Sequence, residues 1–434
     1  MIKKIELFIQ NNRNIIRIVR YALISIVLLV IAWLVDYRFP AVKEKLPEII
    51  LLSPEVTVSF LSNLSGTFLT VSTFTLSTIL VVLNTYQGTF TPRIVQDFID
   101  KPNVLSLFGV FIGGFFYTVL SLFLVQNITF NEPLISGTIA VFYAIAAMLS
   151  FVLFAFKVLT DIKASSVVEN VYRNALILIE DLCRNRKDAK RYQGGKAYKT
   201  LPVYAKESGY FYDINQDAIM RTMGNIQSEL FIEEKIGEFV LRDMIIGTIR
   251  IWEDLDYSDE DYEDLADKVS SGIIVNKTKN DTRDYHYEIT CLVEIAMRAL
   301  SPGINDPNTA ILCIQKIGIL LGQLFSTENN YVILAEDDKV KLVYNGFTPM
   351  EEMYLTFNQI LFYGKEDILV SEAILKSLFM IYLASCDRVY DDIREFFDYC
   401  YKICSENCQS EMDKERIQKI YNSFYKGKEK TLAN

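Results

Sequence analysis

Residues 56–87 read VTVSFLSNLSGTFLTVSTFTLSTILVVLNTYQ, a stretch of 32 residues without a charged side chain. It is longer than the about 20 apolar residues that an α-helix needs to cross the hydrocarbon core of a bilayer. Hydroxyl and amide side chains recur through it, so it is more polar than most membrane-spanning segments. The stretch therefore predicts a long, polar transmembrane helix.

Three further segments are long and apolar enough to cross a bilayer, namely residues 18–35, 105–125 and 134–156. No Asp, Glu, Lys, Arg or His lies in the interior of the four predicted spans. Proton relays, voltage sensors and ion-coupled pumps place ionisable groups inside the membrane. The sequence therefore disfavours an ion-coupled transporter, whereas passive permeation along hydroxyls, amides and backbone carbonyls stays open.

Charge is distributed unevenly along the 434 residues. Residues 1–156 carry 10 Lys and Arg against 8 Asp and Glu, and residues 157–434 carry 34 against 46, giving net charges of +2 and −12. This contrast predicts an integral membrane α-helical domain with four spans in residues 1–156, and a mostly helical α+β cytosolic domain in residues 157–434. The acidic C-terminal part argues against nucleic acid as a partner, because phosphate binding needs a basic face.

The distribution of Lys and Arg also predicts the orientation of the spans. Five basic residues precede or open the first span, and Arg93 and Lys101 follow the second, whereas residues 126–133 contain none. This bias places both termini in the cytoplasm. All seven cysteines lie after residue 157, which agrees with reduced thiols in a cytosolic compartment.

Small polar residues recur in the second span at steps of three and four residues, which places them on one face of a helix. Two interpretations are open. The stripe lines a path for water or ions, or it packs closely against a neighbouring helix, as small residues and hydroxyl groups do in membranes. The candidate pore-lining residues are Ser59, Asn63, Gly66, Thr70, Thr73, Ser77 and Asn84.

Oligomerisation is a consequence of the pore interpretation. Four helices enclose little space, so a pore would need several copies of the chain in the lipid bilayer. Gly109 and Gly113 in the third span, and Ala140 and Ala144 in the fourth, have the four-residue spacing of close helix contacts. Such contacts form within one chain or between chains, and the spacing does not distinguish the two.

The cytosolic domain is expected to contain a small β-containing module in residues 200–250, with a helical remainder. The expected elements of the module are a hairpin of residues 203–205 and 210–213, a short helix capped by Asn215, and two strands over residues 230–236 and 238–246. The expected helices of the remainder include one over residues 157–185 that continues the fourth span, and two or three over residues 351–425.

Two further helices are separated by the turn Ser301-Pro-Gly-Ile-Asn-Asp306. Asp306 fits an N-cap and Pro307 fits the first helical position, so capping alone explains the turn. A helix N-terminus also holds anions or other ligands, which keeps a ligand site open as the second interpretation. The cytosolic ligand candidates are Arg283, Asp284, Arg298, Ser301, Asn305 and Asp306.

Signatures of catalysis and metal binding are few. His286 is the single histidine, which removes most zinc sites and most Ser-His-Asp or Cys-His arrangements. Cys400, Cys404 and Cys408 share one helix face, where a stripe of small buried residues is expected and three thiolate ligands are the alternative. The residues assign no catalytic group, metal site or cofactor, and an enzyme is not the expected function.

The string Arg298-Ala-Leu-Ser-Pro-Gly-Ile-Asn-Asp-Pro307 resembles a bacterial family of membrane proteins filed as domain of unknown function 2254. The strings Thr282-Arg283-Asp284 and Ser208-Gly209-Tyr210, the four spans, and Pro92-Arg93 after the second span are similar as well. The resemblance implies the architecture and a bacterial inner membrane, and it implies no activity. The polar second span leads us to expect an oligomeric channel with a cytosolic regulatory domain. The alternative is a membrane-anchored sensor or scaffold that binds a ligand or protein through that domain.

Overall fold

The computed structural model describes residues 13–39, 43, 45–89, 102–126, 133–161, 163–187, 196–277, 284–327 and 330–431. The chain divides into two compact units, Met1–Ser166 and Val167–Asn434. The first unit is built from long helices, and the second combines helices with two β-sheets.

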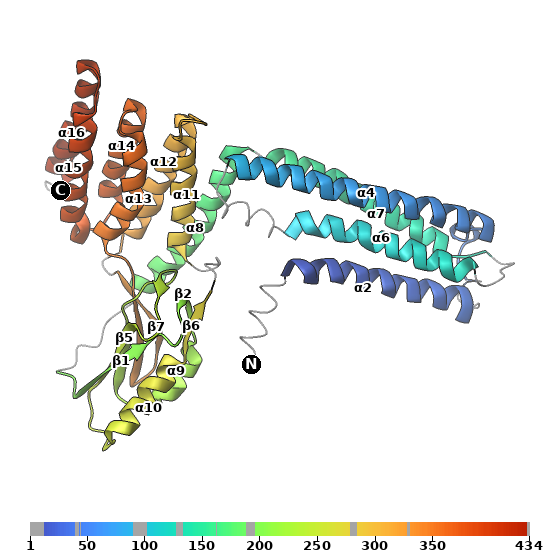
Figure 1. Ribbon diagram of the computed structural model, residues 1–434, viewed down its shortest axis with the longest axis horizontal. Helices are drawn as coiled ribbons and strands as arrows, with labels where there is room; N and C mark the ends of the chain where they lie inside the picture. Colours follow the sequence, from blue (N-terminus) through green and yellow to red (C-terminus); the bar gives the residue numbers. More distant parts are fainter. Residues whose placement is uncertain are drawn as a thin grey trace. The chain divides into compact units, whose positions relative to one another are not determined.

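Four long helices form most of the described part of the first unit, and Figure 1 shows them side by side. Each is long and apolar enough to cross a membrane, so the four predicted spans are present as helices. A π-helical turn, η1 (Leu34–Arg38), extends the first of them, and a 3₁₀ turn, η2 (Glu48–Ile50), precedes the second. The four helices are α2 (Arg13–Trp33), α4 (Pro54–Thr89), α6 (Pro102–Gln126) and α7 (Ser136–Asp161).

Close packing around α6 holds the first unit together, because this helix contacts the other three. A Cβ atom added at Gly113 would lie 2.5 Å from Oγ of Ser25 on α2 and 2.7 Å from the hydroxyl of Tyr143 on α7. A Cβ atom added at Gly114 would lie 2.8 Å from the ring of Phe68 on α4. The small residues of the third span therefore serve helix contacts within one chain.

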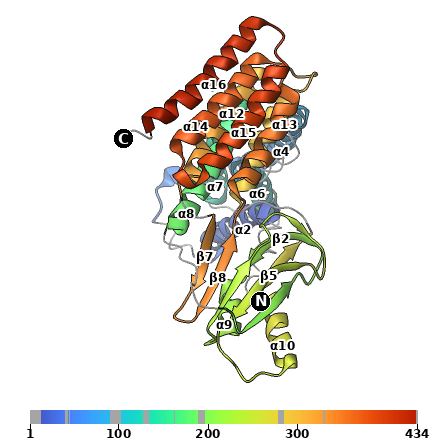
Figure 2. The same cartoon turned by 90° about the vertical axis from the view of Figure 1, so that its left-hand side faces the viewer.

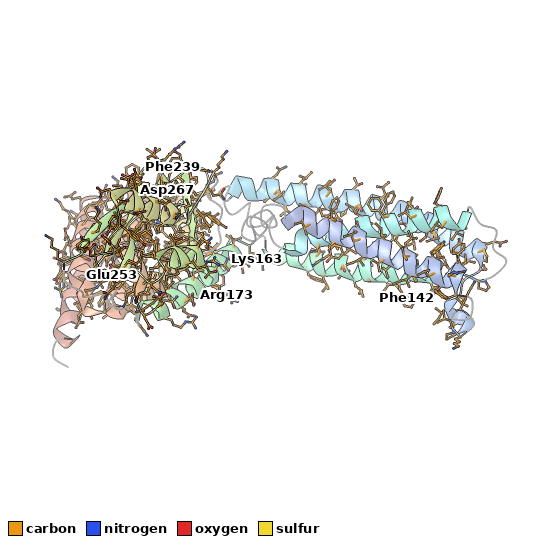
Figure 3. The ribbon with its side chains drawn as sticks, turned by 90° about the horizontal axis from the view of Figure 1, so that it is seen from below. Phe142, Lys163, Arg173, Phe239, Glu253 and Asp267 are labelled. Carbon is orange, nitrogen blue, oxygen red and sulfur yellow. The ribbon has the colours of Figure 1, made fainter. Side chains whose placement is uncertain are left out.

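The outer surface of the first unit is strongly apolar. Phe142 projects from α7 away from the other helices, with 65% of its surface exposed (Figure 3). Phe123 of α6 and Leu153 of α7 are also exposed. A continuous apolar surface of this kind suits contact with lipid hydrocarbon rather than with water.

A buried carboxylate lies at the end of the first span. Asp36 accepts hydrogen bonds from the backbone N–H groups of Ile135 (2.8 Å) and Ser136 (3.2 Å), where α7 begins. The predicted span, residues 18–35, ends one residue before Asp36, whereas the helical segment continues to Arg38. The span therefore carries an ionisable side chain at its end, and this side chain caps a helix far away in the sequence.

Seven long helices form most of the helical part of the second unit among its described residues, and Figure 2 shows several of them stacked next to one another. Two sequence predictions are corrected here. The helix predicted over residues 157–185 does not continue the fourth span, since α7 ends at Asp161 and a new helix begins at Ala164. Residues 351–425 contribute to four helices rather than two or three, because an N-cap such as Asp367 starts a new helix within a few residues of the preceding one. The seven are α8 (Ala164–Lys187), α11 (Tyr285–Ala299), α12 (Pro307–Leu324), α13 (Pro349–Gly364), α14 (Ile368–Ala384), α15 (Tyr390–Glu406) and α16 (Glu411–Thr431).

Two β-sheets and two shorter helices make up most of the remaining described residues of the second unit. The larger has the strand order β1-β5-β3-β8-β7, and the smaller has the order β4-β2-β6. Side chains from both sheets share one core with the helices α9 (Gln216–Met223) and α10 (Asp259–Ser270). The strands are β1 (Lys199–Tyr204), β2 (Gly209–Ile214), β3 (Ser228–Ile232), β4 (Phe239–Val240), β5 (Ile245–Ile251), β6 (Ile273–Asn276), β7 (Tyr331–Glu336) and β8 (Val340–Asn345).

The predicted hairpin of residues 203–205 and 210–213 is wrong. β1 pairs with β5, whereas β2 pairs with β4 and β6 in the other sheet. The β-containing module also extends past residue 250, because β8 joins β3 as a parallel neighbour, with Ser228 opposite Val340. A pairing across more than 100 residues leaves no local pattern in the sequence, whereas the cap of α9 by Asn215 is local and is confirmed.

Candidate functional site

The second span, α4, turns one face toward its own unit and the opposite face outward. Leu61, Phe68, Thr75 and Ile79 are buried on the inner face. At about 100° of rotation per residue, the predicted polar stripe lies roughly half a turn away around the helix axis. All seven members of the stripe are exposed, namely Ser59, Asn63, Gly66, Thr70, Thr73, Ser77 and Asn84.

The hydroxyl groups of this stripe are held by their own helix. Thr70, Thr73 and Ser77 donate to carbonyl oxygens four residues earlier, at distances of 2.9 to 3.0 Å. A hydroxyl oxygen that donates in this way keeps its lone pairs as acceptors. The outward face of α4 therefore presents hydrogen-bond acceptors without a charge.

The other members of the stripe include one glycine, Gly66, and two asparagines, Asn63 and Asn84. A Cβ atom added at Gly66 would meet nothing within 4 Å. The side-chain amides of Asn63 and Asn84 make no hydrogen bond to any described residue. An amide placed in hydrocarbon without a partner costs about 2–7 kcal/mol. The stripe therefore calls for water or a second polar surface.

The turn between α11 and α12 is explained by its own hydrogen bonds. Asp306 accepts from the backbone N–H of Thr309 (3.2 Å) and from the Thr309 hydroxyl (2.6 Å), so both carboxylate oxygens act in capping α12. Ser301 donates its hydroxyl to the carbonyl of Arg298 (2.7 Å). Asn305 has a φ of 49°, in the left-handed region that Asn tolerates. The predicted cap at Asp306 is confirmed.

The six ligand candidates do not form one cluster. Asp284 lies at the N-terminus of α11, where Oδ1 accepts from the backbone N–H of His286 (2.9 Å). At the other end of this 15-residue helix, about 22 Å away, lies the turn. That end holds Arg298, Ser301, Asn305 and Asp306. Arg283 lies outside the described residues.

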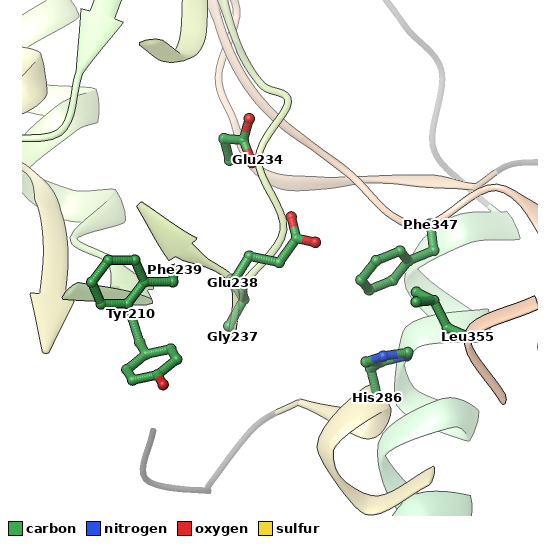
Figure 4. Close-up of a pocket in the computed structure, with 9 residues that line it drawn as sticks. Tyr210, Glu234, Gly237, Glu238, Phe239, His286, Phe347 and Leu355 are labelled. Atoms are coloured by element: carbon green, nitrogen blue, oxygen red, sulfur yellow. The ribbon is translucent and has the colours of Figure 1, made fainter. Parts of the chain in front are cut away.

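A cavity of about 440 Å³ opens in the second unit beside the N-terminus of α11. Figure 4 shows Glu234, Gly237 and Glu238 on one side of the space, and His286 and Phe347 on the other. Its volume lies within the range of small-molecule sites, about 300–1,000 Å³. The lining residues are Tyr210, Glu234, Ile236, Gly237, Glu238, Phe239, His286, Phe347 and Leu355.

Hydrogen bonds to the buried carboxylate of Glu352 fix the His286 wall of the cavity. Nδ1 of His286 lies 2.8 Å from Oε1 of the buried Glu352, and the Tyr285 hydroxyl donates to Oε2 of the same carboxylate at 3.3 Å. Burial, together with the negative charge of Glu352, raises the pKa of Tyr285 well above its usual value, so this hydroxyl stays a donor. The imidazole also lies against the ring of Phe347, with 4.5 Å between ring centres. The wall is therefore held in one arrangement.

The opposite wall is acidic and aromatic. Partial burial, with a smaller contribution from the charge of Glu238, raises the pKa of Glu234 above its usual value. The rings of Tyr210 and Phe239 meet edge to face, with 5.3 Å between their centres. Carboxylates and aromatic rings combined in this way suit a cation better than an anion.

The sequence profile of the predicted membrane protein family DUF2254 matches residues 12–380. The chain belongs to this family. The four candidate spans and all nine residues that line the cavity lie within the matched part.

Curated relatives of this DUF2254 protein occur in mycobacteria. Uncharacterized proteins of Mycobacterium bovis and Mycobacterium tuberculosis are 23% identical to it over 272 residues, which cover 60% of the chain and 51% of each relative. The chain thus spans about half the length of the curated relatives that it matches. No solved structure matches the chain significantly.

Metal binding receives no support from the described residues of this DUF2254 protein, among which no group of three His, Cys, Asp or Glu side chains is arranged to hold an ion. Cys400 and Cys404 of α15 are buried, and burial raises the pKa of both thiols, that of Cys404 to about 11. A protonated thiol is a poor metal ligand. Both residues are buried in the core of the second unit.

The cavity has almost no signal in the sequence. Its lining residues run from Tyr210 to Leu355, and no spacing rule connects positions so far apart. Two weak signals exist: His286 is the single histidine, and Tyr210 follows the turn that Ser208 and Gly209 indicate.

Proposed function

We propose that this membrane protein assembles into an oligomer in which copies of α4 surround a passive path for water or small ions, with the second unit as its regulatory domain. The exposed polar face of α4 carries the proposal. Seven uncharged polar or small residues lie opposite the buried face of the helix, where all of them are exposed in a single chain. A second copy of the chain, or water between copies, supplies the hydrogen-bond partners that lipid hydrocarbon does not offer.

Passive movement is favoured over coupled transport by the chemistry of the stripe. Its members offer hydroxyl and amide groups and one glycine, and none of them titrates. The buried carboxylate of Asp36 is engaged by two backbone N–H groups of another helix. A coupled transporter needs an ionisable group that changes its protonation or its partner during transport.

Assembly through α4 is tested by disulfide cross-linking in native membranes. We expect Asn63→Cys to give a cross-linked dimer under mild oxidation, because copies that face one another through the stripe bring this position together. Leu61→Cys, on the buried face, and the unsubstituted chain should give none. A chain with Asn63→Cys that stays monomeric under oxidation would reject the assembly.

Permeation is tested by the flux of water and of small ions into liposomes that contain the purified protein. The double variant Thr70→Leu and Thr73→Leu should lower the flux about tenfold or more, since an apolar constriction opposes the passage of water and ions. Thr78→Leu is the matched control, because its hydroxyl makes the same bond to the helix backbone but lies off the stripe. Flux equal to that of protein-free liposomes, or flux that the stripe leucines leave unchanged, would contradict the path and leave close helix packing as the role of the stripe.

The orientation that we propose places both termini in the cytoplasm of a bacterial cell, with the spans in the inner membrane. Ile49, between the first two spans, is 90% exposed. We expect Ile49→Cys to react with a membrane-impermeant maleimide added to intact cells, and Glu366→Cys to react only after lysis. The reverse pattern would overturn the orientation.

A second candidate function, a membrane-anchored sensor or scaffold, is favoured by the cavity in the second unit. Its rigid His286 wall and acidic opposite wall are the features of a site that recognises a ligand. The two functions are compatible in one protein, because a ligand-binding domain regulates many membrane proteins.

A further inference from the structure

We infer that the cavity of the second unit binds a small organic ammonium cation. The inference deepens the second candidate function, and it does not depend on the presence of a path through the membrane. Binding by the second unit and flux through the spans are separate measurements, so that one can fail without the other.

The negative charge of the cavity lining favours a positively charged ligand. Glu234 and Glu238 both line it. Partial burial is the main cause of the raised pKa of Glu234, and repulsion from the negative charge of Glu238 is a smaller cause. A bound cation relieves this repulsion, whereas an anion increases it. The acidic character of residues 157–434 as a whole, with 34 Lys and Arg against 46 Asp and Glu, acts in the same direction.

The aromatic lining selects an organic cation over a hydrated metal ion. Tyr210 and Phe239 supply one pair of rings, and Phe347 supplies a third from the opposite side of the space (Figure 4). Rings of this kind attract alkylated ammonium groups through their negative faces, and they offer a metal ion no oxygen ligand. A compact ammonium group with methyl substituents uses both the rings and the carboxylates.

A side chain of the protein already shows this chemistry. The ammonium group of Lys235 lies 6.0 Å from the centre of the Phe347 ring and donates a hydrogen bond to the carbonyl of Glu233 at 2.7 Å. The face of Phe347 therefore accepts a positive charge within this fold. His286 packs against the same ring, with 4.5 Å between ring centres, and Glu352 fixes His286 in turn, so the ring is in place before a ligand arrives.

The test is a calorimetric titration of the full chain, purified in a maltoside detergent, with choline as the ligand. The comparison compound is 3,3-dimethylbutan-1-ol, which has the shape of choline without its charge. We expect saturable binding of choline and binding of the neutral compound that is about tenfold weaker or undetectable. No saturable binding at millimolar choline, or equal binding of the two compounds, would overturn the inference.

Two exposed positions of the cavity provide variants with little risk to folding. Glu238→Gln removes one charge, and Phe239→Leu removes one ring, and each should weaken choline binding about threefold or more. The matched controls are Glu263→Gln on α10 and Phe362→Leu on α13, which lie outside the cavity and should bind choline as the unsubstituted chain does. Unchanged melting temperatures identify the correctly folded variants, and equal weakening in the controls would place the binding elsewhere.

Discussion

Nδ1 of His286 lies 2.8 Å from Oε1 of Glu352, although 66 residues separate them in the sequence. The carboxylate is almost completely buried and also accepts a hydrogen bond from Tyr285. This pair joins α11 to α13 and sets the wall of the cavity from which ligand binding is inferred. Its loss should therefore change both the stability of the second unit and the shape of the site.

We expect Glu352→Ala to destabilise the second unit by about 2–3 kcal/mol, because it removes the buried acceptor of two partly buried donors, His286 and Tyr285. Glu352→Gln keeps the volume and one acceptor oxygen, so its effect should be smaller. The measurement is thermal unfolding in detergent, followed by circular dichroism. Glu366→Ala, at an exposed position, is the control, and a melting temperature lowered equally by Glu366→Ala and Glu352→Ala would refute the importance of the pair.

The cap that Asp36 places on α7 gives a second prediction. Asp36→Ala should cost about 1–2 kcal/mol, since the backbone N–H groups of Ile135 and Ser136 lose their acceptor. Asp36→Asn should cost less, because an amide oxygen still accepts one of the two bonds. The melting temperature of the purified chain ranks the variants, and an Ala variant as stable as the original would show that the cap contributes nothing.

Two glycines in the spans provide an opposed pair of substitutions. Gly113→Ala places a methyl group 2.5 Å from Oγ of Ser25 and 3.0 Å from the backbone oxygen of Tyr21, so it should destabilise the first unit by about 1–3 kcal/mol. Gly66→Ala meets open space on α4 and should leave the stability unchanged or raise it slightly. The measurement is thermal unfolding of the two variants in one detergent. Equal losses of stability in both variants would contradict the packing described for α6.

Titration of Cys404 predicts a loss of stability at alkaline pH. Its pKa is raised from 9.0 to about 11, mainly by burial, so folding favours the protonated thiol. The contribution of this thiol is fully present below pH 9 and is lost as the pH rises toward 11, by roughly 3 kcal/mol in all. Cys404→Ala should reduce the slope of unfolding free energy between pH 9 and 11, whereas Cys408→Ala, at a partly exposed position, should change it less. Identical slopes for all three chains would refute the assignment.

The sequence by itself determined the features that depend on neighbouring residues. Span length and apolar content predict α2, α4, α6 and α7, because a helix in lipid must satisfy its backbone within one segment. The caps at Asn215 and Asp306 follow from side chains placed next to the N–H groups that they bind. The periodicity of α4 also predicts that its small polar residues share one face.

Only the tertiary structure decided which surfaces these local elements meet. Periodicity groups Asn63 with Thr70, but the packing of α6 and α7 against the opposite side turns that face outward. Ser208 and Gly209 indicate a turn, yet the strands on either side of it pair with β5 and with β6 in different sheets. Contacts such as β3 with β8 and His286 with Glu352 form because distant segments bury apolar surface together, and that free energy belongs to no single stretch of sequence.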